Sequence, residues 1–148
     1  MNARELADGD GAHSFVLVFD TGDEVTKELL AFSRSRGITA ASLTGIGAFQ
    51  DVTLGYFELQ QRDYRRIPIS EQVEVLSLVG NLAAGDDGPK LHAHVVVGKR
   101  DGTAHGGHLI EGRVRPTLEI VLVETPTRLR RRSDPATGLA LIDLEERS

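Results

Sequence analysis

Four of the five histidines in the chain lie between positions 92 and 108, and imidazole is the commonest side chain for binding metals in proteins. His92 and His94 occupy alternate positions in the apolar segment Leu-His-Ala-His-Val-Val-Val (91–97). Alternate residues of a β-strand point to one face, so these two imidazoles can bind a single ion at about 2.0–2.1 Å each. His105 and His108 follow on either side of Gly106-Gly107, and the cluster is where we expect metal chemistry.

The pairing of the two histidine segments decides which residue supplies a third ligand. A two-residue turn at Asp101-Gly102 would place His108 opposite Val95, on the wrong face, and His105 about 13 Å from His94. A one-residue bulge at Gly106-Gly107 would instead bring His108 opposite Val96, onto the face of His94.

The sequence therefore predicts a metal site made of His92, His94 and His108, with an open fourth position. Such a site is typical of zinc, and the same ligands suit iron, nickel or manganese. The alternative is a group of ordinary sheet histidines with hydrogen-bonded tips, and His105 is expected to be such a solvated residue.

Glu119 is the candidate catalytic carboxylate for this site. It lies in the largely apolar segment 116–122, where a carboxylate needs a partner. It could support a metal ligand or act as a general base on metal-bound water. An ion pair with Arg113, Arg115 or an arginine of a neighbouring subunit is the interpretation that we favour.

The elements that must position these residues are mostly strands. One helix is expected over Asp23–Arg36, because apolar residues recur there at helical spacing, Thr21 and Glu24 can form a capping box, and Gly37 supplies a stop. Strands are expected at Phe15–Phe19, Ile38–Thr44, Asp51–Leu59, Val73–Leu82, Lys90–Gly98 and Thr117–Glu124, with Ile67-Pro68-Ile69 and Leu139–Leu144 as edge pieces. The pattern predicts the α+β class, a largely antiparallel β-sheet with one main α-helix packed on it.

Length and composition favour one domain. The 148 residues are 40% hydrophobic and 26% charged, which suffices for one core over residues 13–148 after a flexible arm at 1–12. The absence of cysteine excludes disulfides and thiolate metal sites. No apolar stretch approaches the ~20 residues of a membrane span and no secretory signal is visible, so we expect a cytoplasmic protein without membrane contact.

The net charge of −5 has the wrong sign for a protein that neutralises nucleic-acid phosphates over its whole surface. The arginine cluster at 128–132, within a C-terminal extension at 125–148, could contact phosphate. Nearby Glu124 and the acidic tail Asp143–Glu146 instead favour a solvated edge or pairing between subunits. DNA binding is therefore expected to be weak or absent.

A set of motifs in fixed order resembles the PPC domain, the plant and prokaryote conserved domain that also occurs in plant AT-hook nuclear proteins. The motifs are Gly-Ile-Gly-Ala-Phe (45–49), Leu-Gly-Tyr-Phe (54–57), Glu-Val-Leu-Ser-Leu-Val-Gly-Asn (74–81), Leu-His-Ala-His-Val (91–95), Gly-Gly-His-Leu (106–109) and Pro-Thr-Leu-Glu-Ile-Val-Leu (116–122). The resemblance covers residues 14–124. It implies an α+β homotrimer with a metal, usually taken as zinc, at His92, His94 and His108. It also implies a DNA-binding label, which plant members owe to separate AT-hooks that this chain lacks.

Together these features predict a homotrimeric, metal-binding protein that acts as a binding or regulatory module, with a small-molecule ligand at the metal. The strands after Ile38 also favour a trimer, because they expose more sheet than one helix can cover. Two alternatives stay open: a DNA-binding transcriptional regulator, and a metal-dependent hydrolase or lyase that would use Glu119.

Overall fold

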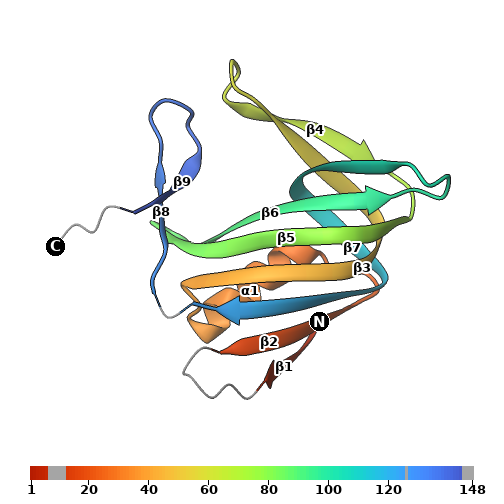
Figure 1. The fold of residues 1–148 in the computed structure, drawn as a ribbon, viewed down its shortest axis with the longest axis horizontal. Coiled ribbons are helices and arrows are strands. Elements are labelled where there is room, and N and C mark those ends of the chain that lie inside the picture. The colour runs from red at the N-terminus through yellow and green to blue at the C-terminus, as the bar shows by residue number, and fades with distance from the viewer. Residues whose placement is uncertain (7–12, 126, 145–148) are drawn as a thin grey trace.

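A computed structural model of the chain describes residues 1–6, 13–125 and 127–144, which form one helix and nine strands. The elements are β1 (Asn2–Leu6), β2 (Ser14–Asp20), α1 (Val25–Arg36), β3 (Ala40–Glu58), β4 (Asp63–Ile69), β5 (Val73–Gly85), β6 (Gly88–Gly98), β7 (Ala104–Glu124), β8 (Arg130–Ser133) and β9 (Ala140–Asp143). All strands join one sheet in the order β1-β2-β7-β3-β5-β8-β9, while β4 pairs with β3, and β6 pairs with β5 and β7 (Figure 1). Apart from one parallel bridge between β5 and β8, the pairings are antiparallel, so the predicted α+β architecture is confirmed.

Helix α1 begins where the side chain of Glu24 replaces the missing helical hydrogen bonds. The Glu24 carboxylate accepts from the backbone N–H groups of Thr26 and Lys27, which makes Glu24 the N-cap itself. The predicted capping box with Thr21 is wrong, because the Thr21 hydroxyl donates to the carbonyl of Pro116 on β7 instead. Gly37 ends the helix in the left-handed conformation, as predicted, with φ +67°.

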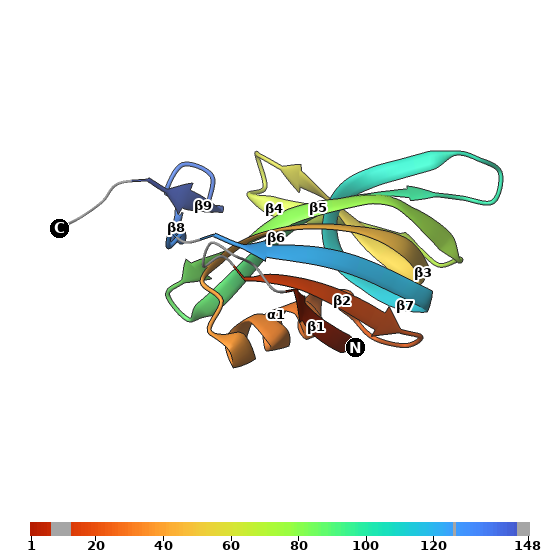
Figure 2. The same cartoon turned by 60° about the horizontal axis from the view of Figure 1, so that its bottom comes forward.

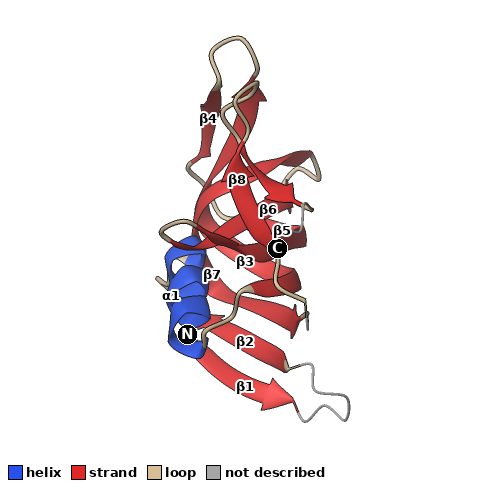
Figure 3. Ribbon diagram, turned by 90° about the vertical axis from the view of Figure 1, so that its left-hand side faces the viewer, coloured by secondary structure: helices blue, strands red, loops and turns tan. Residues whose placement is uncertain are grey.

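The core lies between α1 and one face of the sheet. Val25, Leu29 and Phe32 on the helix are buried against alternate residues of the strands, among them Leu118, Ile120 and Leu122 on β7. The side views show α1 along this face only, and the opposite face carries no helix in the described part of the chain (Figures 2 and 3). We call the side of β3, β5, β6 and β7 opposite α1 the open face.

Strands β3 and β7 are long and irregular, which corrects the prediction of shorter, separate strands. The predicted segments Ile38–Thr44 and Asp51–Leu59 belong to one strand, β3, whose pairing shifts at Gly45/Gly47 and again after Gly47. A Cβ at Gly47 would collide with the carbonyl oxygen of Thr117, so glycine lets the strands pass here. Strand β7 pairs with β6 through residues 104–108 and with β3 through 108–124, so β3, β5, β6 and β7 close a circuit.

Both ends of the chain extend the sheet. Residues 2–6 pair with β2 as strand β1, so the expectation of a flexible arm at 1–12 is wrong for this part, and residues 7–12 lie outside the described residues. Backbone hydrogen bonds order Asn2–Leu6 even though each residue is exposed. At the other end β8 and β9 form an antiparallel pair beside β5. No described helix has the length and apolar character that crossing a membrane requires.

Candidate metal centre

His92 and His94 project together from β6, as the alternation of the strand predicts. Their intervening neighbour Ala93 and the following Val95 are buried toward α1, so the two imidazoles lie on the open face. The Nε2 atoms of His92 and His94 are 3.2 Å apart. Two nitrogens bound to one tetrahedral ion at about 2.0–2.1 Å are separated by roughly 3.3 Å, so the pair needs almost no movement to bind the same ion.

His108 on β7 lies directly opposite His94 in the antiparallel pairing of β6 with β7. The connection is longer by one residue than the two-residue turn considered from the sequence. The Gly102 N–H donates to the Lys99 carbonyl, the Lys99 N–H donates to the Thr103 carbonyl, and Gly102 has φ +83°. This is a three-residue loop with glycine in the left-handed position.

The longer loop replaces the predicted bulge at Gly106-Gly107, which is wrong: the pairing runs without interruption from His94–His108 to Gly98–Ala104. Gly107 has a different role. A Cβ there would lie 2.9 Å from the carbonyl oxygen of Gly55, so the absence of a side chain lets β7 approach β3 just before His108. His105 pairs with Val97 and therefore lies on the other face from His94.

The three imidazoles form a compact group. One ring nitrogen from each of His92, His94 and His108 lies within 4.8 Å of the others. The three ring centroids are 5.1, 5.3 and 5.6 Å apart in pairs. The Nδ1 atom of His108 is buried and has no hydrogen-bond partner among the described residues. An orphaned buried nitrogen is costly unless something binds it, and a metal ion between the three rings would satisfy it.

The environment favours the neutral form of two of these imidazoles, His92 and His108. Burial is the largest cause that lowers the pKa of His108 to about 4, and the neighbouring His92, His94 and Arg131 contribute to the same shift in that order. Burial also lowers the pKa of His92, helped by the charge of Arg131. Neutral imidazole is the form that binds metal, so the burial of these two rings favours their metal-binding form.

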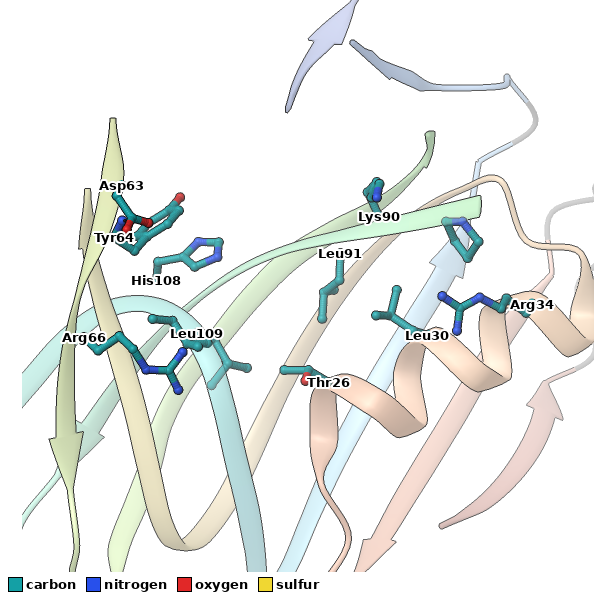
Figure 4. A pocket seen from close by; sticks show the side chains of 12 residues that line it. Thr26, Leu30, Arg34, Asp63, Tyr64, Arg66, Lys90, Leu91, His108 and Leu109 are labelled. Carbon is teal, nitrogen blue, oxygen red and sulfur yellow. The ribbon is translucent and has the colours of Figure 1, made fainter. Parts of the chain in front are cut away.

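Tyr64 on β4 positions His108. Its ring stacks on the imidazole with a centroid distance of 4.5 Å and an interplanar angle of 24°, and Phe57 packs edge-on against Tyr64. Figure 4 shows Tyr64 and His108 side by side at one end of a pocket of about 630 Å³ whose other end is formed by Leu30 and Arg34 of α1. The β3–β4 hairpin thus holds one of the three candidate ligands in place.

The histidine cluster itself opens into another pocket, of about 560 Å³, between the β3–β4 hairpin and the β8–β9 hairpin. Figure 1 shows both hairpins rising from the same side of β5 and β6. The described residues that line this pocket are Gly55, Tyr56, Phe57, Tyr64, Lys90, Leu91, His92, His94, Gly107, His108, Arg131, Leu139, Ala140 and Leu141. None of them is an aspartate or a glutamate.

Glu119 does not reach this pocket within one chain. It is exposed, and it lies opposite Val18 and Ile46 on the neighbouring strands. At the level of Glu119, β3 and β5 lie between β7 and β6. Three strand spacings, about 14 Å, therefore separate Glu119 from β6. In the described part of the chain Glu119 forms no ion pair with Arg113, which instead approaches Asp51 at 3.8 Å.

Arg131 is, with Tyr64, a residue near the site that sequence reasoning missed. The cluster 128–132 is expected at a solvated edge or in pairing between subunits; Arg130 forms an exposed ion pair with Asp86, and Arg132 forms a half-buried one with Asp143. Arg131 points the other way and is only 6% exposed. If a strand had been predicted here, alternation would have placed Arg131 on the opposite face from Arg130 and Arg132. A run of arginines has no apolar periodicity, however, so the sequence does not predict a strand.

The chain is similar to known proteins in both sequence and fold. The model of the Plants and Prokaryotes Conserved (PCC) domain matches residues 7–126. A plant- and prokaryote-conserved protein from Pyrococcus horikoshii is 33% identical, with a TM-score of 0.83 over 90% of this chain and 92% of that one. A metal-containing protein from Archaeoglobus fulgidus is also 33% identical, with a TM-score of 0.81 over 87% and 91%.

A third solved structure, of a protein with a proposed DNA-binding role from Bacteroides thetaiotaomicron, is 29% identical. Its TM-score is 0.86 over 95% of this chain and 96% of that one. Among proteins with curated descriptions, none matches the sequence.

Proposed function

Because the chain belongs to the Plants and Prokaryotes Conserved (PCC) domain family, we propose that it is a metal-binding module of this family that holds one divalent ion, zinc by preference, at His92, His94 and His108. The observation that carries the proposal is the convergence of three imidazoles, one of which has a buried nitrogen without a hydrogen-bond partner among the described residues. The metal-containing relative from Archaeoglobus fulgidus supports it independently.

A three-histidine site leaves a coordination position open, at which a bound zinc ion would polarise a ligand as a Lewis acid. The pocket supports ligand binding at that position. The three imidazoles line it together with apolar residues such as Leu139 and Leu141. We therefore assign the module a binding or regulatory role, with a small molecule as its ligand.

The enzyme alternative, a metal-dependent hydrolase or lyase, is less well supported. General-base catalysis at a metal-bound water needs a group within hydrogen-bond reach of that water. No described residue that lines the pocket carries a carboxylate, and Glu119 belongs to a row about 14 Å from β6. Within one chain, the geometry favours binding over hydrolysis.

We also propose that three copies of the chain assemble around the open face. Its apolar side chains include Ile46, Val79, Val96, Val121 and Val123, which are 62%, 50%, 41%, 43% and 38% exposed in the single chain. Several of them occupy neighbouring strands, with Thr44 between Val79 and Val121 in register. An apolar sheet surface of this kind is typical of contacts between subunits.

Metal analysis of the purified protein tests the function directly. Protein prepared without chelators should contain one equivalent of metal per chain, measured by inductively coupled plasma mass spectrometry, and lose it on dialysis against a chelator. Reconstitution with zinc should restore one equivalent. If the protein takes up no zinc, nickel, manganese or iron, the metal-binding proposal is wrong and the three histidines have an ordinary structural role.

DNA binding is the second candidate, favoured by the role proposed for the relative from Bacteroides thetaiotaomicron. The net charge of −5 opposes binding to a polyanion, and Arg130 and Arg132 of the arginine cluster are already paired with Asp86 and Asp143. We expect affinity no better than the non-specific range of roughly 10⁻⁴–10⁻⁶ M at physiological salt. Fluorescence anisotropy with duplex DNA at two salt concentrations measures this, and submicromolar, sequence-selective binding would favour the regulator.

A further inference from the structure

Arg131 is a buried cation whose hydrogen-bonding capacity is only partly used. One Nη atom donates to the carbonyl of Ala140 at 2.7 Å, and the other donates to the side-chain oxygen of Asn81 at 2.6 Å. A guanidinium has five N–H donors, and its buried Nε atom has no partner among the described residues. Arg131 forms no ion pair in residues 1–6, 13–125 and 127–144, although it is only 6% exposed.

Of the three arginines on β8, only Arg131 lines the pocket of the three histidines. On β8, Arg130 and Arg132 reach Asp86 and Asp143 at the surface, while the alternate residue Arg131 faces the pocket of the three histidines. Its hydrogen-bond acceptor Asn81 lies directly opposite His92 in the pairing of β5 with β6. The guanidinium is thus tied to the strand position adjacent to a metal-binding side chain.

The charges around this pocket do not balance without a further group. A divalent ion on three neutral imidazoles and the guanidinium would place three positive charges in one cavity that no described carboxylate lines. The other cation of the lining, Lys90, is already paired with Asp87 at 2.7 Å. Buried charge of one sign is unfavourable unless an opposite charge joins it.

We propose that the pocket binds a small organic carboxylate, with its carboxylate group between the metal and Arg131 and its apolar body against Leu139 and Leu141. The proposal rests on the metal binding proposed above and names the chemical class of the ligand. Arg131 is its specificity-determining residue, and this residue lies beyond the segment matched by the family model, which ends at residue 126.

A carboxylate fits better than a phosphate for two reasons. The planar guanidinium matches the two oxygens of a carboxylate, and much of the remaining wall is apolar or aromatic, including Tyr56 and Phe57. Phosphate sites generally supply several donors, often the N–H groups at the start of a helix, and no residue of α1 lines this pocket.

The experiment uses the full-length protein loaded with cobalt(II) in place of zinc, because cobalt absorbs visible light and its spectrum changes when a ligand joins the metal. Benzoate, benzamide and inorganic phosphate are titrated separately, with calorimetry as a second readout. Benzamide has the shape of benzoate without its charge. We expect benzoate to alter the cobalt spectrum and to bind at least about tenfold more tightly than benzamide or phosphate.

Two variants locate the effect on one side chain. Arg131→Gln should keep one equivalent of cobalt and lose at least about tenfold in benzoate affinity, as expected when a charged hydrogen-bond donor is removed. Arg130→Gln removes the adjacent arginine of the same strand, which is 56% exposed, and should leave benzoate affinity unchanged. Circular dichroism and thermal melting check that both variants fold.

The outcomes separate this proposal from the metal site. Failure of the wild-type protein to bind cobalt overturns both. Normal cobalt uptake with equal affinity for benzoate and benzamide, or equal benzoate affinity in wild type and Arg131→Gln, overturns the carboxylate proposal alone. Tighter binding of phosphate would reassign the ligand class. If Arg131→Gln does not fold, the comparison of benzoate with benzamide on the wild-type protein decides.

Discussion

His94 on β6 and His108 on β7 face each other directly across one antiparallel pair, and a three-residue loop closed by Gly102 sets that register. With a loop shorter by one residue, His108 would face Val95 and its side chain would lie on the other side of the sheet. The position of one turn therefore determines whether the chain has two converging imidazoles or three.

The first prediction concerns the three ligands. We expect His92→Ala, His94→Ala or His108→Ala to abolish stoichiometric metal binding. Removing a residue that only supports a ligand lowers metal affinity about 10–100-fold, and removing a ligand itself should lower it more. His105→Ala should retain metal because His105 lies on the other face, and His13→Ala should retain it because His13 pairs with Glu5. Mass spectrometry of metal content checks all five proteins, and loss of metal from His105→Ala would contradict the assignment.

The second prediction concerns pH. The pKa of His108 is about 4 in the folded chain against an ordinary value of 6.5, so the unfolded chain binds more protons between these two values. The free energy of unfolding of the metal-free protein should therefore fall as the pH is lowered from 6.5 towards 4, and this contribution should level off below 4. The slope from this one group cannot exceed about 1.4 kcal/mol per pH unit, and solvent screening of a half-buried ring reduces it. Urea unfolding of wild type and His108→Gln across this range measures how the free energy of unfolding of each depends on pH, and the two slopes should become equal above pH 6.5.

The third prediction concerns assembly. Light scattering should give a mass three times the 16.0 kDa of the chain. Val121→Asp places a charge on the open face, where the side chain is 43% exposed, and should dissociate the assembly while the fold persists. The matched control is Leu59→Asp at the β3–β4 turn, 70% exposed, which should remain a trimer. A wild-type monomer at micromolar concentration would rule out the trimer.

The fourth prediction separates the two adjacent glycines. In Gly107→Ala the new methyl group would lie 2.9 Å from the Gly55 carbonyl oxygen, so β7 must move away from β3 at the residue before His108. We expect a stability loss of about 1–3 kcal/mol and weakened metal binding. In Gly106→Ala the nearest atoms are 3.4 Å away, an ordinary contact, and metal affinity should hold. Equal metal affinity in the two variants would show that the crossing of β3 and β7 does not position His108.

The fifth prediction tests whether stability alone controls metal binding. Glu24 caps α1 and also accepts a hydrogen bond from the Gly112 N–H on β7 at 3.2 Å. Glu24→Ala should lower the free energy of unfolding by about 0.5–2 kcal/mol, as loss of an N-cap does, without changing metal content at room temperature. Thermal melting with metal analysis measures both, and a loss of metal from this folded variant would link the helix cap to the site.

Local patterns in the sequence determined the helix, the location of most strands and the common face of two candidate ligands, His92 and His94. Alternation places His92 and His94 on one face of a strand wherever that strand lies, and Gly37 ends the helix because it tolerates the left-handed conformation. Likewise, the apolar spacing of Val25, Leu29 and Phe32 is a property of the helix alone. These features need no knowledge of distant residues, because backbone geometry repeats over a few positions.

Only the tertiary structure decided how distant segments meet. The sequence indicated His108 as a ligand but attributed its placement to a bulge, because loop length and bulges both shift a register by one residue and leave similar glycine patterns. Arg131 and Tyr64 reach the site from β8 and β4, 23 and 44 residues away from His108 in the chain. Such contacts follow from the closing of β3, β5, β6 and β7 into a circuit, and long-range strand pairing depends on the packing of the whole sheet rather than on any local sequence signal.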